Sequence, residues 1–313
     1  MRYGKLKIFA GSSHPAFAEA VAAHLGVALG QVEILRFSNE NLMVKVLENV
    51  RGDDVFVIQT MAPPVNENII ESLIMLDALK GASAARITAV LPYFPYSRSD
   101  KKDQPRISIT ARLMADLYEA AGANRVLTAD LHAPQITGFF HCPVDQLIAA
   151  PVICDYYLQR DLKNYVLIAG DAGEAKELGR YANRLDLPMA IVDKRREGND
   201  EKAKARHLIG DVGGKHALLI DDEIATGGTL IEAMEFVKSR GALSVSAAAT
   251  HGVLSKNAHI RLSESDMDEV VVCDTIPVQH KKTSKMRILS LAPLFAEAIK
   301  GIHYDQSISS LFR

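Results

Sequence analysis

Short apolar runs alternate along the whole chain with longer stretches in which apolar residues recur every three or four positions. The apolar runs are residues 6–10, 32–35, 54–59, 87–91 and 125–129 in the first half, and 166–169, 189–192, 217–220, 244–248 and 269–272 in the second half. Helical patterns cover residues 17–25, 69–79, 107–121 and 291–302. Such alternation is typical of a mainly parallel sheet with helices on both faces. The sequence therefore predicts an α/β protein.

The length of the chain and the repetition of this pattern predict two domains. The chain has 313 residues, of which 48% are hydrophobic, and this is enough to bury a core in each of two domains. The scheme starts again near Pro151, so we expect an N-terminal domain over residues 1–150 and a C-terminal domain over residues 151–313. No low-complexity linker separates the halves, which can share a helix or a strand. The helix predicted at 291–302 has an apolar face and is expected to pack back on one of the domains.

The charge and the cysteine content exclude several classes of protein. The net charge is −2 at pH 7 and the pI is about 6.6, so composition gives no sign of binding to nucleic acid or to a membrane surface. No apolar stretch reaches the roughly 18 residues that a membrane span needs. Cys142, Cys154 and Cys273 are widely spaced and odd in number, which favours a reducing compartment over a disulfide framework or a zinc site. We expect a cytoplasmic protein.

Residues 217–229 carry the most specific chemical signal. The apolar run 217–220 leads into Asp221 and Asp222, and a short loop of Ala, Thr and Gly at 225–229 then opens onto a helical pattern. Free N–H groups at a helix N-terminus bind phosphate, glycines let the backbone approach an anion, and carboxylates accept hydrogen bonds from vicinal sugar hydroxyls. The segment predicts a sugar-phosphate site, against the simpler alternative of a solvated turn.

The loops after two apolar runs of the first half carry further candidates. Ligands of open parallel sheets bind beyond the carboxyl ends of the strands, so these loops are considered together. Residues 92–103 form an aromatic segment followed by a charged arm, and aromatic side chains beside Arg98 can stack a purine. His132 follows the run 125–129 with acids nearby, and it can ligate a metal or neutralise a phosphate. The simpler alternatives are a solvated loop and a hydrogen-bonded structural histidine.

Two loops of the second half carry charges suited to a metal or a phosphate. Asp171 lies in a second candidate phosphate loop, residues 170–174, where it is placed to hold Mg²⁺. Lys194 and Arg196 follow the run 189–192, and the polar stretch 197–206 lacks apolar periodicity. We interpret this region as a flexible catalytic lid whose cations close over a migrating phosphoryl group. The alternative is an ordinary charged surface loop.

Taken together, these segments resemble the ribose-phosphate pyrophosphokinases along essentially the whole chain. The matching segments are 9–15 (FAGSSHP), 36–38 (RFS), 51–59 (RGDDVFVIQ), 73–80 (LIMLDALK), 130–135 (DLHAPQ), 138–140 (GFF), 193–196 (DKRR), the loop 221–229 and the tail 307–312 (SISSLF). The resemblance implies two phosphoribosyltransferase-like domains. It also implies Mg²⁺-dependent transfer of the β,γ-diphosphoryl group of ATP to the 1-hydroxyl of ribose 5-phosphate, which gives 5-phosphoribosyl 1-diphosphate and AMP.

The resemblance further implies roles for the residues at matching positions. Ribose 5-phosphate would bind to Asp221, Asp222, Ala225, Thr226, Gly227, Gly228 and Thr229. ATP would bind to Arg98, Asp100 and Asp145, with Phe37, Asn39 and Asn41 supplied by an adjacent subunit. Mg²⁺ would be held by His132 and Asp171, and the catalytic residues Lys194 and Arg196 would stabilise the transferring group. Self-association, as a homohexamer or a dimer, is part of the same implication.

Several positions depart from the family pattern. Asn39-Glu40-Asn41 stands where Asp-Gly-Glu is common, so the nucleotide contacts are expected to differ. Glu174 replaces the second glycine of the diphosphate loop, where a carboxylate aimed at phosphate would repel it. Ala225 replaces an acid of the diacid loop that many bacterial members carry.

Two other functions agree with parts of the sequence. A phosphoribosyltransferase that consumes the activated sugar would share the diacid loop, but it would not need His132 or the Lys194 lid. A non-catalytic homologue that regulates a partner would explain Asn39, Asn41 and Glu174, but not the retention of the other charged groups. Formation of AMP without a base distinguishes the kinase from both.

Overall fold

The computed structural model describes residues 3–170, 173, 175–195 and 204–312, with the side chains of 194–195, 204–206 and 312 outside the description. The chain forms two compact units. Unit 1 runs to Ile148 and also contains Thr275–Pro277 and the segment from Ser290 onwards, whereas unit 2 contains Ala149–Asp274 and Val278–Leu289. The first boundary lies close to residue 150, but the C-terminal segment belongs to unit 1. Each unit therefore consists of more than one segment of the chain.

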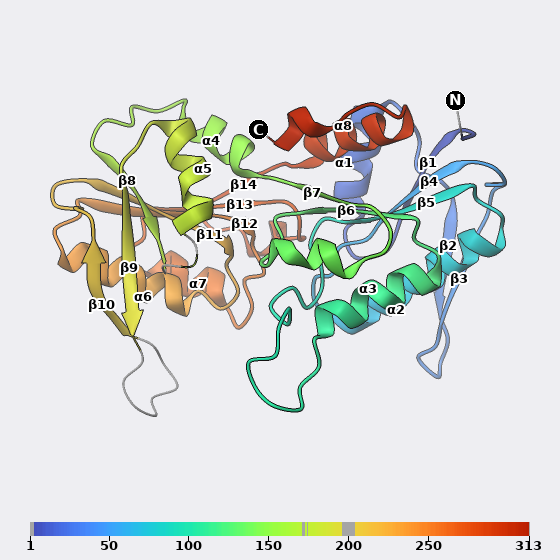
Figure 1. Ribbon diagram of the computed structural model, residues 1–313, viewed down its shortest axis with the longest axis horizontal. Coiled ribbons are helices and arrows are strands. Elements are labelled where there is room, and N and C mark those ends of the chain that lie inside the picture. The colour runs from blue at the N-terminus through green and yellow to red at the C-terminus, as the bar shows by residue number, and fades with distance from the viewer. Residues whose placement is uncertain (1–2, 171–172, 174, 196–203, 313) are drawn as a thin grey trace. The chain divides into compact units, whose positions relative to one another are not determined.

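Unit 1 contains a five-stranded parallel sheet between two layers of helices (Figure 1). In spatial order the strands are β1 (Leu6–Ala10), β4 (Asp54–Ile58), β5 (Arg86–Leu91), β6 (Arg125–Ala129) and β7 (Val144–Leu147). One face is covered by α1 (Pro15–Leu25) and α8 (Ala292–His303), and the other by α2 (Val65–Gly81) and α3 (Thr110–Ala121). Every residue of β4 and β5 is buried, which explains why these central strands are continuous apolar runs.

The run 32–35 was expected to belong to the parallel alternation, and this expectation is wrong. It forms β2 (Val32–Arg36), which pairs in antiparallel fashion with β3 (Leu42–Val46) in a separate two-stranded sheet. The connection is a tight turn in which the Phe37 N–H donates to the Asn41 carbonyl at 2.9 Å. A connection this short can only join antiparallel strands, because parallel strands need a long crossover. The hairpin leaves the Phe37 side chain 49% exposed at its tip.

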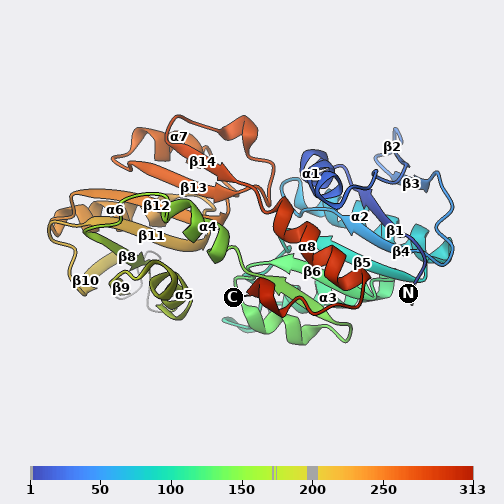
Figure 2. The same cartoon turned by 90° about the horizontal axis from the view of Figure 1, so that it is seen from above.

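The C-terminal helix explains why unit 1 takes up the end of the chain. Helix α8 lies beside α1 in both views, and the rings of Phe17 and Phe295 meet edge to face with centroids 5.4 Å apart (Figures 1 and 2). Burial of such aromatic pairs is a strong stabilising contribution. The expected packing of residues 291–302 on a domain is therefore observed, on the N-terminal one. A short 3-10 helix, η4 (Ser309–Phe312), follows α8.

Unit 2 contains a seven-stranded sheet, parallel except at one edge. In spatial order the strands are β10 (Lys204–Ile209), β9 (Met189–Arg195), β8 (Tyr165–Ala169), β11 (His216–Glu223), β12 (Ser244–His251), β13 (Glu269–Cys273) and β14 (Met286–Leu289). Helices α4 (Ala150–Tyr157) and α5 (Ala175–Leu185) cover one face, and α6 (Gly228–Ser239) and α7 (Ala258–Glu264) cover the other (Figure 1). A short 3-10 helix, η3 (Gln279–Lys281), precedes β14. Both units thus confirm the predicted fold class. Among the described residues, no helix combines the length and apolarity that crossing a membrane requires.

Candidate active site

Strand β11 positions the two carboxylates of the predicted sugar-phosphate site. The strand was expected to end at Ile220, but it continues to Glu223 because β12 pairs with it over its whole length, with Asp221 opposite Ala249. On its other side, pairing with β8 stops at Ile220. Asp221 and Asp222 therefore stand at the carboxyl end of the sheet. Successive strand side chains alternate between faces, so the two side chains lie on opposite faces of the sheet at the strand end.

The loop after β11 presents backbone N–H groups at the start of α6. Gly227 precedes the helix with φ 74°, a left-handed conformation that glycine adopts without strain. The N–H groups of residues 225–229 find no acceptor in the part of the chain that the structure describes. Unpaired N–H groups at the positive end of a helix form a binding site for phosphate. The predicted residues Ala225, Thr226, Gly227, Gly228 and Thr229 are thus brought together in one loop, which is a candidate anion site.

In unit 1, a hydrogen bond joins the loops that follow β5 and β6. The Gln135 amide donates to an Asp100 carboxylate oxygen at 2.7 Å, which links the charged arm to η1 (Pro134–Phe139). The arm is anchored at its base by the Tyr96 hydroxyl, which donates to Asn66 at 2.6 Å. Asp100 and the exposed Arg98 therefore lie on the same edge of the sheet as the loop that follows β6. This is the edge where α/β proteins bind ligands.

His132, predicted to hold a metal, lies exposed at this same edge. Two residues earlier, Asp130 has φ 24°, a rare conformation for a residue with a side chain, and its N–H donates to the Leu147 carbonyl at 3.0 Å. Strained backbone of this kind is concentrated at functional sites. Imidazole and carboxylate groups are both ligands of divalent cations, and His132 and Asp130 supply one of each in the segment that follows β6. Asp171, the second predicted ligand, lies outside the described residues.

The remaining residues predicted for ATP lie in two other places. Asn39 and Asn41 form the tip of the β2–β3 hairpin with Phe37, and the Asn41 N–H donates to the Asn39 side chain at 3.2 Å. Asp145 lies within β7, opposite Leu127 of β6, and its carboxylate is ion-paired with Arg125. The structure therefore does not place Asp145 among the loops at the carboxyl edge.

The region interpreted as a lid contains more regular structure than expected. Lys194 lies within β9, where its backbone pairs with Ala205 of β10 in an antiparallel hairpin, so residues 204–206 belong to a strand. Apolar periodicity did not predict β10, because β10 lies at the edge of the sheet and an edge strand needs no apolar run. Arg196, residues 197–203 and Glu174 lie outside the described residues.

A buried polar network that the sequence did not reveal fixes the loop after β1. The Glu71 carboxylate, on α2, is 4% exposed and accepts hydrogen bonds from the Ser12 N–H at 2.6 Å and from the Gln59 side chain at 2.8 Å. The same Gln59 accepts a bond from the Ser13 N–H at 3.0 Å. Ser12, Ser13 and Glu71 line a cavity of about 260 Å³ that Arg36 also borders. The available signal was the polar residues Asn68, Glu71 and Ser72 among the apolar residues of the buried helical face.

These features define the class of protein: an α/β phosphoribosyl-binding protein, with a diacid and an anion loop at the carboxyl end of a parallel sheet. Two family models match the chain, the N-terminal domain of ribose phosphate pyrophosphokinase over residues 6–122 and the phosphoribosyl synthetase-associated domain over residues 199–313. The ribose-phosphate pyrophosphokinase of Caldanaerobacter subterraneus is 49% identical over 309 residues, 98% of each chain. That of Wolinella succinogenes is 46% identical over 306 residues, again 98% of each.

A solved structure gives the same result. The crystal structure of phosphoribosylpyrophosphate synthetase from Mycobacterium smegmatis matches with a TM-score of 0.92 and 40% identity, covering 96% of this chain and 100% of that chain. The chain belongs to the ribose-phosphate pyrophosphokinase family, and it is an enzyme. The resemblance inferred from the sequence motifs is confirmed.

Proposed function

We propose that the protein transfers the β,γ-diphosphoryl group of ATP to the 1-hydroxyl of ribose 5-phosphate and releases AMP. The observation that carries this proposal is the row of N–H groups at residues 225–229, which lack acceptors among the described residues and follow directly on the diacid strand end. The N–H groups bind the 5-phosphate, and Asp221 and Asp222 accept hydrogen bonds from the ribose hydroxyls. Membership of the family supports the diphosphoryl transfer itself.

ATP is assigned to the loops of unit 1. The hydrogen bond between Asp100 and Gln135 supports this assignment, because it holds the arm that carries Arg98 beside the loop after β6. Phe37, Asn39 and Asn41 are assigned to the nucleotide of an adjacent subunit, and the exposed ring of Phe37 supports that role. Asp145 is ion-paired with Arg125 through one carboxylate oxygen, so a contact with a nucleotide would use the other oxygen or replace this pair.

Mg²⁺ is assigned to His132 and Asp171. The exposure of the His132 imidazole at the carboxyl edge of the sheet supports the first part of this assignment, and the position of residue 171 two residues after the end of β8 supports the second. When bound, the ion neutralises charge on the β- and γ-phosphates.

The reaction is an in-line displacement at the β-phosphorus of ATP. The 1-hydroxyl oxygen forms a bond to this phosphorus while the bond to the oxygen shared with the α-phosphate breaks, so that AMP leaves and the hydroxyl proton passes to solvent water. The protein contributes positioning and charge neutralisation. Lys194 and Arg196 are assigned to stabilise the charge that develops on the transferring group.

Self-association as a homohexamer or a dimer and a cytoplasmic location complete the proposal. The exposed aromatic ring at the hairpin tip supports the first. The three cysteines are free thiols, which supports a reducing compartment. Light scattering tests the association, and a monomer that turns over at full rate would contradict it.

The function is tested by incubating the protein with ribose 5-phosphate, ATP and Mg²⁺, and by separating the nucleotides by chromatography. We expect AMP and 5-phosphoribosyl 1-diphosphate in equal amounts, and no AMP when ribose 5-phosphate is omitted. No nucleobase is added, so a phosphoribosyltransferase would form no AMP. A folded protein that forms no AMP under any metal or phosphate condition would refute the proposal and favour a regulatory homologue.

A further inference from the structure

We propose that Arg261 and Ser255 are positioning residues that aim the N–H groups of the phosphate loop at the ligand. This inference rests on the proposed function, because it concerns the ribose 5-phosphate loop of unit 2. It adds two residues, both more than twenty-five positions after the loop, that the motif does not contain. Neither residue needs to touch the substrate, since both act through the backbone of residues 224–226.

Three successive carbonyl groups of the loop are held by one segment, residues 254–261. The Leu254 N–H donates to the Ile224 carbonyl at 3.0 Å. Ser255 donates twice to the Ala225 carbonyl, from its N–H at 2.9 Å and from its hydroxyl at 3.3 Å. The Arg261 guanidinium donates to the Thr226 carbonyl. All four donors and all three acceptors belong to unit 2.

The direction of these carbonyls determines the direction of the N–H groups that follow them. A trans peptide unit is planar, and its C=O and N–H bonds point in opposite directions. Anchoring the carbonyls of residues 224, 225 and 226 on one side therefore aims the N–H groups of Ala225, Thr226 and Gly227 to the other side. These are three of the N–H groups that have no acceptor among the residues described. The hydrogen bonds from residues 254–261 thus order the Ala-Thr-Gly segment as a row of N–H donors.

Electrostatics favours the same arrangement. A carbonyl oxygen turned toward the phosphate would repel it, so holding three carbonyls away removes a competing conformation of the loop. An arginine guanidinium is a cationic donor, so the hydrogen bond from Arg261 to the Thr226 carbonyl is charge-assisted and stronger than a neutral one. Helix α7, which carries Arg261, also supports the loop by packing: a Cβ added at Gly227 would lie 3.4 Å from Leu262 and 3.5 Å from Ala258.

The test compares Arg261→Met, Arg261→Lys and Ser255→Ala with a matched control, Arg240→Met. Arg240 is an exposed arginine of the same unit, at the far end of α6, where it lies over the Phe236 ring 4.9 Å from its centroid. Binding of ribose 5-phosphate is measured by titration calorimetry, and steady-state kinetics are measured with both substrates. Thermal melting checks the fold of each variant.

We expect Arg261→Met to weaken ribose 5-phosphate binding and raise its KM about tenfold, with the KM for ATP unchanged and kcat within twofold. Tenfold corresponds to about 1.4 kcal/mol, the scale of one charge-assisted hydrogen bond. Arg261→Lys retains a cationic donor and is expected to recover part of the loss, and Ser255→Ala to show a smaller loss, because its N–H still donates. Arg240→Met is expected to behave as wild type.

The outcomes separate this inference from the proposed function. If the wild-type protein forms no AMP, the function is wrong. If the wild type is active and Arg261→Met binds ribose 5-phosphate with unchanged affinity, the positioning role is wrong. The role is also wrong if the KM values of both substrates rise together in proportion to a fall in melting temperature, since that is the behaviour of a purely structural contact. If Arg261→Met does not fold, Ser255→Ala and Arg261→Lys decide the question through the same measurements, namely the affinity for ribose 5-phosphate, both KM values and the melting temperature.

Discussion

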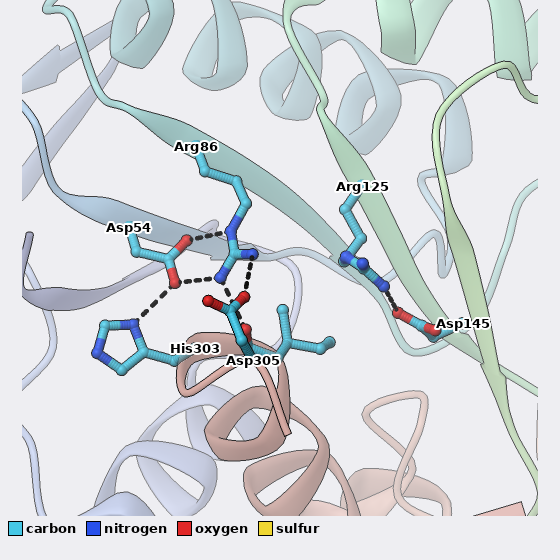
Figure 3. A network of polar contacts seen from close by, with 7 residues as sticks. Asp54, Arg86, Arg125, Asp145, His303 and Asp305 are labelled. Atoms are coloured by element: carbon cyan, nitrogen blue, oxygen red, sulfur yellow. Dashed lines mark hydrogen bonds and ion pairs between the residues drawn. The ribbon is translucent and has the colours of Figure 1, made fainter. Parts of the chain in front are cut away.

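Arg86 and Asp54 form a bidentate ion pair between the first residues of the two central strands of unit 1 (Figure 3). The Arg86 Nε to Asp54 Oδ1 distance is 2.7 Å, and the Nη2 to Oδ2 distance is 2.6 Å. The pair also fastens α8: the His303 ring lies 2.8 Å from Asp54, and Arg86 donates to the Ile302 carbonyl at 2.9 Å. Residues about 250 positions apart are thereby joined, which accounts for the place of the C-terminal segment in unit 1.

Removing one partner of this pair should be costly. The Asp54 side chain is fully buried, so Arg86→Met leaves a carboxylate without its cation, and we expect unit 1 to lose about 3–5 kcal/mol of stability in urea denaturation. The control is Arg112→Met, which removes the pair with Asp116 on α3, whose side chains are 45% and 48% exposed, and it should cost about 1 kcal/mol or less. Equal losses in the two variants would contradict the structural role assigned to the Asp54 network.

The two glycines of the phosphate loop should respond differently to alanine. Gly227 has φ 74°, and an alanine in the left-handed region costs about 1–2 kcal/mol, so Gly227→Ala should lower the melting temperature. Gly228 starts α6, and a Cβ there would lie 3.9 Å from its nearest neighbour, so Gly228→Ala should melt as wild type. Its methyl group would still obstruct the approach of a phosphate to the backbone, and we expect the KM for ribose 5-phosphate to rise about tenfold. A stable Gly228→Ala variant with an unchanged KM for ribose 5-phosphate would show that the phosphate does not bind at this loop.

The sequence predicted those elements of the fold that are determined by their own residues, and it missed features that depend on distant parts of the chain. Strands β4 and β5 were found because burial on both faces makes them apolar throughout. Strand β2 was found, but it was placed in the wrong sheet, because a five-residue strand has the same pattern in a hairpin and in a parallel sheet, and only the turn at 37–41 decides. The extension of β11 through its three acids could not be seen, since it depends on pairing with β12 rather than on apolarity.

The same distinction holds for the site. The anion loop was predicted because a Gly-Gly turn between a diacid and a helix is a local signal. Arg261 and Ser255 were missed because they act on that loop from 35 and 30 residues away, and no spacing rule connects them to it. Asp145 matched a motif position, but its ion pair with Arg125 arises from the neighbouring strand.

Cys142 should report on the charge of Glu119. It is the only one of the three cysteines that is not fully buried, and burial together with the neighbouring Glu119 carboxylate raises the pKa of its thiol to about 12. Glu119 also accepts bonds from the His141 and Cys142 N–H groups at 2.5 and 2.6 Å, which a glutamine can retain. Glu119→Gln should therefore lower this pKa, and the rate of alkylation at pH 8 should rise about threefold for each unit of the change.

Alkylation is followed by mass spectrometry of the folded protein. The buried Cys154 and Cys273 serve as internal controls, because they should stay unmodified in both proteins. A rise at all three thiols would indicate unfolding, and an unchanged rate at Cys142 would show that Glu119 has no influence on the thiol.

The cluster around Glu269 in unit 2 should make stability depend on acid pH. Burial alone would raise the pKa of Glu269, but hydrogen bonds from Arg160 at 2.8 Å and Tyr156 at 2.7 Å outweigh it, and the pKa lies below its ordinary value. A depressed pKa contributes stability that is present above the unfolded value, about 4.3, and is lost as the pH falls through the folded value. Because Arg160 is one-third exposed, we expect Glu269→Gln to cost about 1 kcal/mol at pH 7, with the difference shrinking once the pH falls below the unfolded value and lost below the folded value. Denaturation curves at pH 7, 5 and 3.5 measure this, and a constant difference would contradict it.

Lys194 should act in the transition state rather than in substrate binding. It lies at the penultimate position of β9, in the hairpin with β10, and it is assigned to the charge that develops on the transferring diphosphoryl group. Loss of one preorganised charge contact lowers kcat by roughly a hundredfold or more, so Lys194→Ala should do this with little change in either KM. Asp222→Asn should have the opposite effect: it should raise the KM for ribose 5-phosphate more than it lowers kcat, because it weakens an acceptor of hydrogen bonds from the ribose hydroxyls. Lys163→Ala, at an exposed position before β8, is the control for a surface lysine and should match wild type. If Lys194→Ala keeps kcat near wild type, or changes only the melting temperature, then the lysine is a structural or surface charge of the β9–β10 hairpin and has no part in the transfer.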